Sequence, residues 1–127
     1  MDVLIDSTKG FEKDLAKLSK EERALVVEKI NSCSQLFPTQ KAAVYRKLHR
    51  LHLPSLVNGY ESSLYTLRIS YKLRLILAVD EDPIFEQTVF TLFRVVQHGE
   101  LEKAYKSVAE SLYQELFAKE RETTKMS

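Results

Sequence analysis

Apolar residues in the first part of the chain recur at helical spacing. A short apolar run, Val3 to Ile5, precedes the capping residues Asp6 to Thr8 and predicts a brief strand that leads into a helix. Phe11, Leu15 and Leu18 then follow at i, i+4 and i+7, with charged residues between them. This spacing places the three apolar side chains on one helical face, so we expect a helix that packs on a core and ends near Leu18.

A second helix is expected to begin after Ser19. Ser19 and Glu22 form a capping-box pattern, in which each side chain accepts a hydrogen bond from the other residue's backbone amide. Pro38 disfavours helical geometry at the residue before it and marks the helix end. The apolar stripe between these points consists of Leu25, Val26, Ile30, Cys33, Leu36 and Phe37. The two helices are expected to form a helical hairpin. Residues 38–63 show no regular pattern, although 42–51 could form a short helix.

The apolar period then changes to two, which is typical of β-strands. Tyr65, Leu67 and Ile69 alternate with polar residues, as expected for a half-buried strand, and a similar apolar series runs from Leu73 to Val79. After a polar turn, Thr88 to Val96 is a third β-rich run. The connections are short, and parallel pairing would need long crossovers, so we expect a three-stranded antiparallel meander.

A final amphipathic helix completes the predicted fold. Its apolar stripe consists of Leu101, Tyr105, Val108, Leu112 and Leu116. The fold class is therefore α+β, with a short N-terminal strand, a helical hairpin, a three-stranded antiparallel meander and a C-terminal helix. Residues 1–118 are expected to form one domain, and 119–127 a frayed tail.

Composition narrows the possible functions. The chain has no apolar run long enough for a membrane span and no secretory signal, so we expect a soluble, cytoplasmic protein. Cys33 is the single cysteine and allows neither an internal disulfide nor a cysteine metal site. No phosphate-binding glycine loop and no HExxH motif is present. His49 and His52 could share a metal ion, but polar surface is the better interpretation because no third ligand lies near them in the sequence.

Charge is unevenly distributed along the chain. Residues 41–79 carry seven basic residues and one acidic residue, a charge of +6, whereas the whole chain is +1, which leaves −5 for the rest. One basic face for a polyanion or an acidic partner would explain this asymmetry, and so would a solvated charged surface.

The order of elements, together with the segments LYTLRISYKLRLILAV and TLFRVVQHGELEKAY, resembles the RelE/ParE toxin superfamily over residues 3 to about 112. Members that cleave messenger RNA in the ribosomal A site carry lysines and arginines on a concave sheet surface and use a tyrosine near the C-terminus. The resemblance implies a RelE-like fold and a catalytic set of four residues: Arg68, Arg74, His98 and Tyr105. Thr66 and Gly99 depart from the pattern, because a lysine and a phosphate-stabilising arginine are expected there.

These residue types suit attack of an RNA 2′-hydroxyl on the adjacent phosphate. Arginine pairs two phosphate oxygens and stays charged, so Arg74 with Arg68 is the candidate clamp. A histidine can exchange protons near neutral pH, and Tyr105 would stack on a base or assist proton transfer. The structural alternatives are surface ion pairs for the arginines, an exposed turn for His98 and a core position for Tyr105. Further candidate nucleic-acid-binding residues are Lys47, Arg50, Lys72 and Arg94.

The resemblance thus implies the toxin of a toxin–antitoxin pair, a ribosome-dependent mRNA endonuclease that inhibits translation. Such an mRNA interferase would be a metal-independent endoribonuclease without a small-molecule cofactor. Its partners would be a cognate antitoxin, the ribosome and mRNA, with no membrane. Two alternatives remain open, a ParE-like inhibitor of DNA gyrase and a catalytically inactive RelE-fold interaction module.

Overall fold

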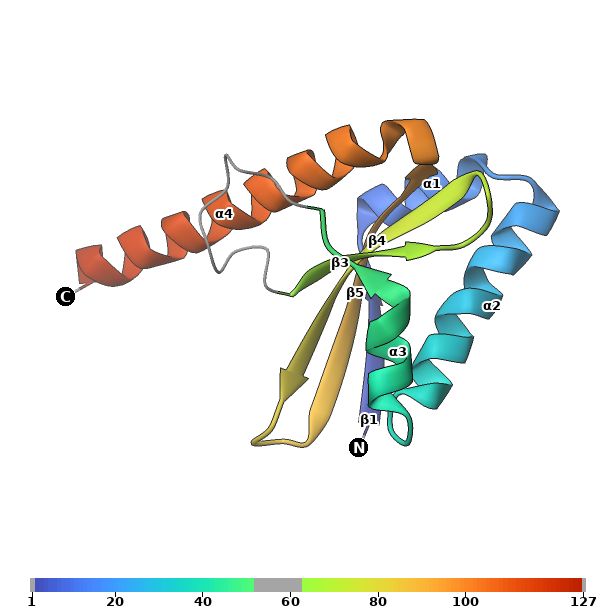
Figure 1. Cartoon of the computed structure of the whole chain (residues 1–127). Coiled ribbons are helices and arrows are strands. Elements are labelled where there is room, and N and C mark those ends of the chain that lie inside the picture. The colour runs from blue at the N-terminus through green and yellow to red at the C-terminus, as the bar shows by residue number, and fades with distance from the viewer. Residues whose placement is uncertain (1, 52–62, 127) are drawn as a thin grey trace.

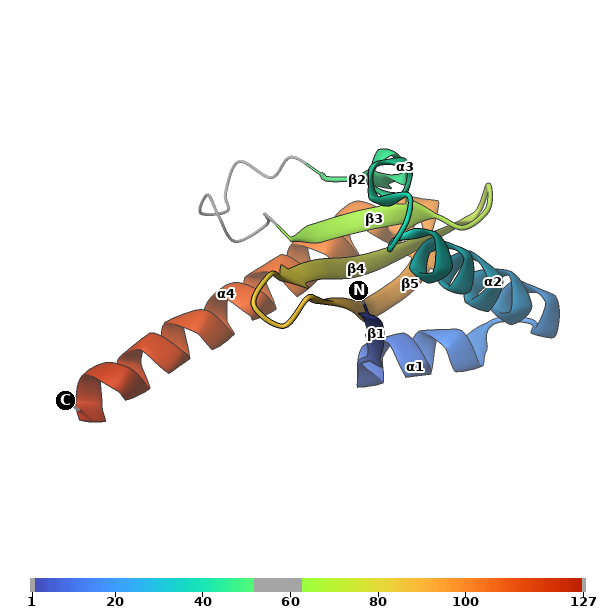
Figure 2. The same ribbon diagram turned by 90° about the horizontal axis from the view of Figure 1, so that it is seen from below.

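The computed structural model describes residues 2–51 and 63–126, which form a five-stranded sheet with helices on both faces (Figures 1 and 2). The strands are β1 (Asp2–Ser7), β2 (Leu48–His49), β3 (Leu64–Arg68), β4 (Leu73–Asp82) and β5 (Gln87–Gln97). The helices are α1 (Lys9–Lys17), α2 (Lys20–Leu36), α3 (Lys41–Lys47) and α4 (Leu101–Met126), with a 3-10 turn η1 (His98–Glu100) before α4. The predicted α+β class is confirmed.

The sheet has the strand order β1-β5-β4-β3-β2. Strands β3, β4 and β5 form the predicted antiparallel meander. The predicted N-terminal strand, β1, pairs in parallel with β5, the last strand in the chain. Strand β2 adds a two-residue antiparallel pairing to β3, in the region where the sequence shows no regular pattern. The remainder of that region, residues 52–62, lies outside the described residues.

Local capping explains where the first two helices begin. The Thr8 side chain accepts a hydrogen bond from the Phe11 amide, and both halves of the predicted Ser19–Glu22 capping box are present. Each cap satisfies backbone amides that have no partner in the first helical turn. From the connection between them, α1 and α2 diverge to form a V beside the sheet (Figures 1 and 2).

The larger core lies between the sheet and α1, α2 and α3. It contains the predicted apolar faces of the first two helices and the odd-numbered apolar series of β3 and β4. Its buried members are Phe11, Val26, Ile30, Cys33, Phe37, Val44, Leu48, Leu67, Ile69, Leu73, Leu75, Leu77, Val79, Phe90, Leu92 and Val95.

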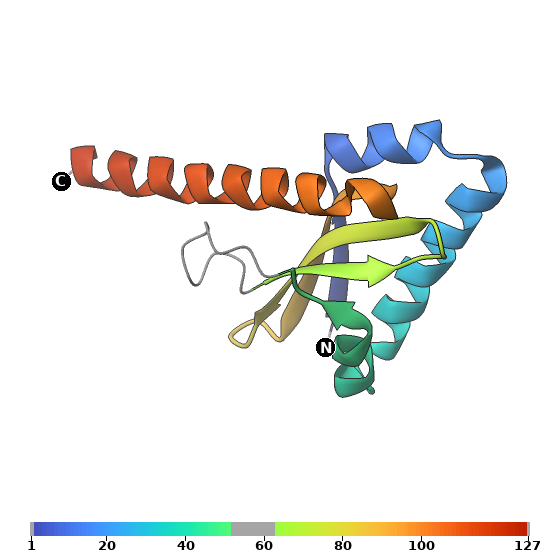
Figure 3. The same ribbon diagram turned by 45° about the horizontal axis from the view of Figure 1, so that its top comes forward.

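Helix α4 covers the opposite face of the sheet and creates a second core. Buried Leu64 and Ile76 on the strands meet Leu101, Ala104, Tyr105, Val108 and Ala109 on the helix. The central strands are therefore buried on both faces, whereas their alternation predicts one solvated face. Helix α4 continues through Met126, and its C-terminal half projects beyond the sheet (Figure 3). No glycine or proline interrupts residues 101–126, and the frayed tail after residue 118 stays a prediction.

A β-bulge in β5 interrupts the alternation in that strand. Ile76 pairs with Arg94 and Leu77 with Leu92, so Phe93 is the extra residue. The Asp14 carboxylate on α1 accepts hydrogen bonds from Arg94 Nε at 2.6 Å, Arg94 Nη2 at 3.1 Å and the Val95 amide at 3.0 Å. The bulge is thus tied to α1. In the described part of the chain, no helix has the length and apolarity of a membrane span.

Candidate functional site

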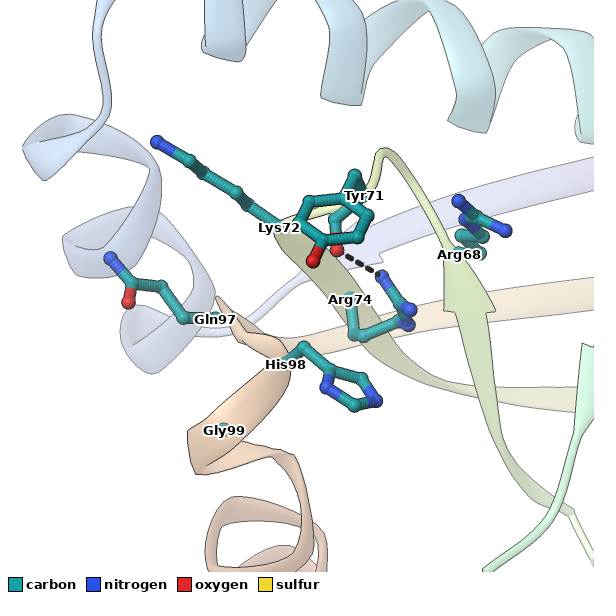
Figure 4. A pocket seen from close by; sticks show the side chains of 7 residues that line it. All are labelled: Arg68, Tyr71, Lys72, Arg74, Gln97, His98 and Gly99. Atoms are coloured by element: carbon teal, nitrogen blue, oxygen red, sulfur yellow. Dashed lines mark hydrogen bonds between the residues drawn. The ribbon is translucent and has the colours of Figure 1, made fainter.

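A basic pocket lies at one end of the sheet, where the β3–β4 turn, the end of β5 and η1 meet. We call it the first cavity, and its volume is about 490 Å³. The residues that line it come from the ends of β3, β4 and β5, the β3–β4 turn and η1 (Figure 4). They are Arg68, Tyr71, Lys72, Arg74, Gln97, His98 and Gly99.

The β3–β4 turn fixes the position of Arg74. Its Nη1 donates hydrogen bonds to the carbonyl oxygens of Ser70 at 2.6 Å, Leu73 at 3.1 Å and Tyr71 at 3.3 Å, the last drawn in Figure 4. The Ser70 hydroxyl accepts a bond from the Leu73 amide at 3.2 Å and closes the same turn. The guanidinium is therefore anchored through one nitrogen, while its planar shape leaves further N–H groups for a ligand.

The backbone also fixes His98 beside this turn. The His98 amide donates to the Lys72 carbonyl at 2.7 Å, which joins η1 to the β3–β4 turn. In Figure 4 the imidazole lies next to the Arg74 side chain. Three of the four predicted catalytic residues, Arg68, Arg74 and His98, thus line one cavity together with the predicted RNA-binding residue Lys72.

The charges in this cavity are all of one sign at neutral pH. Arg68 and Arg74 are direct cross-strand partners, an arrangement in which like charges repel. Among the described residues, neither arginine forms an ion pair, and no carboxylate lines the cavity. Such a concentration of uncompensated positive charge favours an anionic ligand.

Tyr71 and Gln97 line the cavity but were not predicted from the sequence. The Tyr71 ring is 83% exposed at the tip of the turn, where an aromatic side chain is free to stack on a flat ligand. The sequence signal for this site was a turn: Ser70 and Lys72 are polar and flank Tyr71 between two apolar series.

The other predicted nucleic-acid-binding residues lie elsewhere. Lys47 lines a different cavity, which Arg68 shares. The Arg50 guanidinium carbon stands 4.7 Å from the centre of the Tyr65 ring, and its Nη2 donates to the Tyr65 hydroxyl at 2.7 Å. Arg94 is held by Asp14 on α1. His49 also lines the cavity that contains Lys47, and His52 lies outside the described residues.

Tyr105 is not brought into the first cavity. Its side chain is fully buried between α4, to which it belongs, and the sheet. Its hydroxyl donates a hydrogen bond to the Leu64 carbonyl at 3.0 Å. This geometry corresponds to the structural alternative for Tyr105, a core position at the start of the last helix.

The two departures from the family pattern have different surroundings. Thr66 is buried, and its hydroxyl donates to the His49 carbonyl at 3.3 Å, so it joins β3 to β2. Gly99 lines the first cavity, and a Cβ atom added to it would meet no atom within 4 Å. The position of the missing arginine is therefore open to a larger side chain.

Neither a protein-family model nor a curated protein sequence matches the chain. Solved structures do match. A chain in the toxin–antitoxin complex RelBE2 from Mycobacterium tuberculosis is 20% identical, with a TM-score of 0.50 over 77% of this chain and 100% of that chain. A chain in the archaeal RelE–RelB complex from Pyrococcus horikoshii is 16% identical, with a TM-score of 0.50 over 78% of this chain and 98% of that chain. This likeness confirms the predicted RelE-like fold.

Proposed function

We propose that this chain, which has the RelE-like toxin fold, is the toxin of a toxin–antitoxin pair and cleaves messenger RNA on the ribosome. The observation that carries the proposal is the first cavity, in which two arginines, a lysine and a histidine gather without a carboxylate. A fold alone does not determine chemistry, so the argument depends on these residues. The activity would operate in the cytoplasm, and a cognate antitoxin would neutralise it.

The proposed reaction is attack of an RNA 2′-oxygen on the adjacent phosphorus. The O2′–P bond forms, the P–O5′ bond breaks, the 2′-hydroxyl loses a proton and the leaving 5′-oxygen gains one. Arg74 and Arg68 stabilise the extra negative charge of the phosphorane, because a guanidinium pairs two oxygens and remains cationic. His98 transfers one of the two protons, because an imidazole changes protonation near neutral pH. The nucleophile belongs to the RNA, so the side chains need only to stabilise charge and transfer protons.

Tyr71 replaces Tyr105 as the candidate for base stacking. Its exposed ring stands on the turn that Arg74 holds, beside the proposed position of the scissile phosphate (Figure 4). A base that is turned out of a single strand could stack on it, a contact that does not depend on sequence. The ring would thus place the ribose next to the cavity.

The ribosome supplies what this site lacks. Among the described lining residues, His98 is the single imidazole, and we assign the second proton transfer to water or a ribosomal group. A net charge of +1 gives little long-range attraction for free RNA. The ribosome would hold the mRNA strand in the orientation that in-line attack needs.

Induction of the chain in a bacterium tests this function. Protein synthesis should stop first, while RNA synthesis and chromosome integrity persist, and purified protein should cut mRNA when ribosomes are present. Early DNA damage would indicate the gyrase inhibitor instead, and unchanged growth would indicate an inactive interaction module. Efficient cleavage of naked RNA at physiological salt would contradict the ribosome dependence.

Gly99→Arg should increase the activity. A Cβ atom at Gly99 would meet no atom within 4 Å, and a third guanidinium would add a charge-assisted contact to the phosphate. We expect roughly a tenfold faster cleavage of ribosome-bound mRNA, equivalent to about 1.4 kcal/mol of transition-state stabilisation. Gly99→Ala is the matched control, since it adds a Cβ without charge and should leave the rate unchanged. A slower Gly99→Arg enzyme with the parent melting temperature would show that the phosphate does not lie beside η1.

A further inference from the structure

A second basic cavity, of about 280 Å³, opens where α2 faces the ends of α3 and β3. Its cations are Lys29 on α2, Lys47 at the end of α3 and Arg68 at the end of β3. They come from three separate elements, so the tertiary fold, and not a local run of basic residues, brings them together. The remaining lining residues are Ser32, Cys33, His49 and Leu67.

Nothing in the described lining neutralises these cations. No carboxylate lines the second cavity, and among the described residues the three cations form no ion pairs. Burial raises the pKa of the Cys33 thiol, although Lys47 and Lys29 act in the opposite direction. The thiol therefore stays protonated at neutral pH and provides no counter-charge. Three cations grouped in this way favour an anion between them.

Arg68 lines both cavities and makes them neighbours. In Figure 4 its side chain stands apart from that of Arg74 and points toward the helix drawn above it. A polynucleotide carries one negative charge per nucleotide, so a strand whose scissile phosphate occupies the first cavity has further phosphates to either side. The second cavity offers cations to one of them.

We propose that the second cavity binds a backbone phosphate of the same single RNA strand, adjacent to the segment held in the first cavity. Lys29 and Lys47 contact this phosphate, the Ser32 hydroxyl is placed to donate to it, and Arg68 lies between the two positions. The inference rests on the proposed RNA-cleaving function. It extends that function because it gives the RNA strand a path across the end of β3. The contact is to the backbone and adds affinity without base preference.

The test uses a fluorescent single-stranded oligoribonucleotide of about ten nucleotides, a length within the range of single-strand sites. Its riboses are 2′-O-methylated so that it cannot be cut, and its affinity is measured by anisotropy over a range of salt concentrations. The double variant Lys29→Ala/Lys47→Ala should bind about tenfold more weakly at low salt. The slope of log affinity against log salt should fall by about 0.7, the value for one lost phosphate contact on a single strand.

The matched control is Lys13→Ala/Lys17→Ala, which removes two exposed lysines from α1 that line neither cavity. It should retain the parent affinity and slope. Equal affinities of the parent and the Lys29/Lys47 variant would overturn the inference, as would an equal loss in the control or no binding by the parent at low salt. With ribosomes, the variant should need more substrate for half-maximal cleavage at an unchanged maximal rate.

The two proposals fail separately. A parent protein that binds the oligonucleotide through Lys29 and Lys47 but never cuts mRNA on ribosomes would remove the proposed function and leave the second cavity as an RNA site. If the parent protein cuts mRNA but its affinity for the oligonucleotide does not depend on Lys29 and Lys47, only the RNA site in the second cavity is contradicted.

Discussion

Arg74→Ala should reduce cleavage of ribosome-bound mRNA on the order of 100-fold, by analogy with the loss of a donor to an oxyanion. The guanidinium that the β3–β4 turn holds beside His98 is the strongest candidate for the phosphate clamp. Arg74→Lys should recover part of the rate, because an ammonium keeps the charge but loses the paired donors. Growth arrest on induction and the rate of mRNA cutting on ribosomes both measure this effect.

Arg74 also binds turn carbonyls, so the stability of this variant must be measured in parallel. The bond to the Tyr71 carbonyl is exposed, whereas those to the Ser70 and Leu73 carbonyls are part-buried, so the cost should be about 1 kcal/mol, the typical net value of a hydrogen bond. Arg23→Ala removes an exposed arginine from α2 that lines neither cavity and serves as the control. The site assignment is wrong if folded Arg74→Ala cuts mRNA at the parent rate.

Tyr105→Ala should lower the free energy of unfolding by about 3 to 5 kcal/mol, the usual range for removing a buried aromatic ring. The ring is fully buried between α4 and the sheet, next to Leu64 and Ile76. The total free energy of unfolding of a small domain is only about 5 to 15 kcal/mol. This variant should therefore unfold at a much lower denaturant concentration than the parent. Chemical denaturation followed by circular dichroism gives the difference.

Tyr105→Phe separates packing from chemistry at the same position. It keeps the ring but leaves the buried Leu64 carbonyl without this donor, at a cost of about 1 to 3 kcal/mol. Cleavage by the folded variant should equal that of the parent, because the hydroxyl does not line the first cavity. A severe loss of rate at unchanged stability would restore Tyr105 as a catalytic residue and require α4 to move during the reaction. By contrast, Tyr71→Ala should weaken activity without affecting the core, because its ring is exposed.

The sequence was informative wherever one side chain's environment followed from local spacing. The capping box at Ser19, the apolar faces of the first two helices and the odd-numbered series from Leu73 to Val79 all appear as expected. Arg74 leaves its strand on the face opposite that series because alternation is a local property of a strand. The same alternation gave no signal that Tyr71, in the predicted connection between β3 and β4, is exposed. Ile69 and Leu73 are four residues apart, so the series keeps its phase through the turn, and Tyr71 is hidden within it.

Only the tertiary structure determined which residues from distant parts of the chain lie next to each side chain. Arg94 and Arg74 look alike in sequence, yet Arg94 is bound by Asp14, which is 80 residues away, while Arg74 lines an open cavity. Tyr105 is buried because α4 folds across the second face of the sheet, and amphipathic spacing cannot specify the surface on which a helix packs. Arg68 joins two cavities because α2 and α3 pack beside the end of β3. Spacing fixes a side chain's direction within its own element, whereas long-range packing determines its neighbours, and charge has a function only in relation to those neighbours.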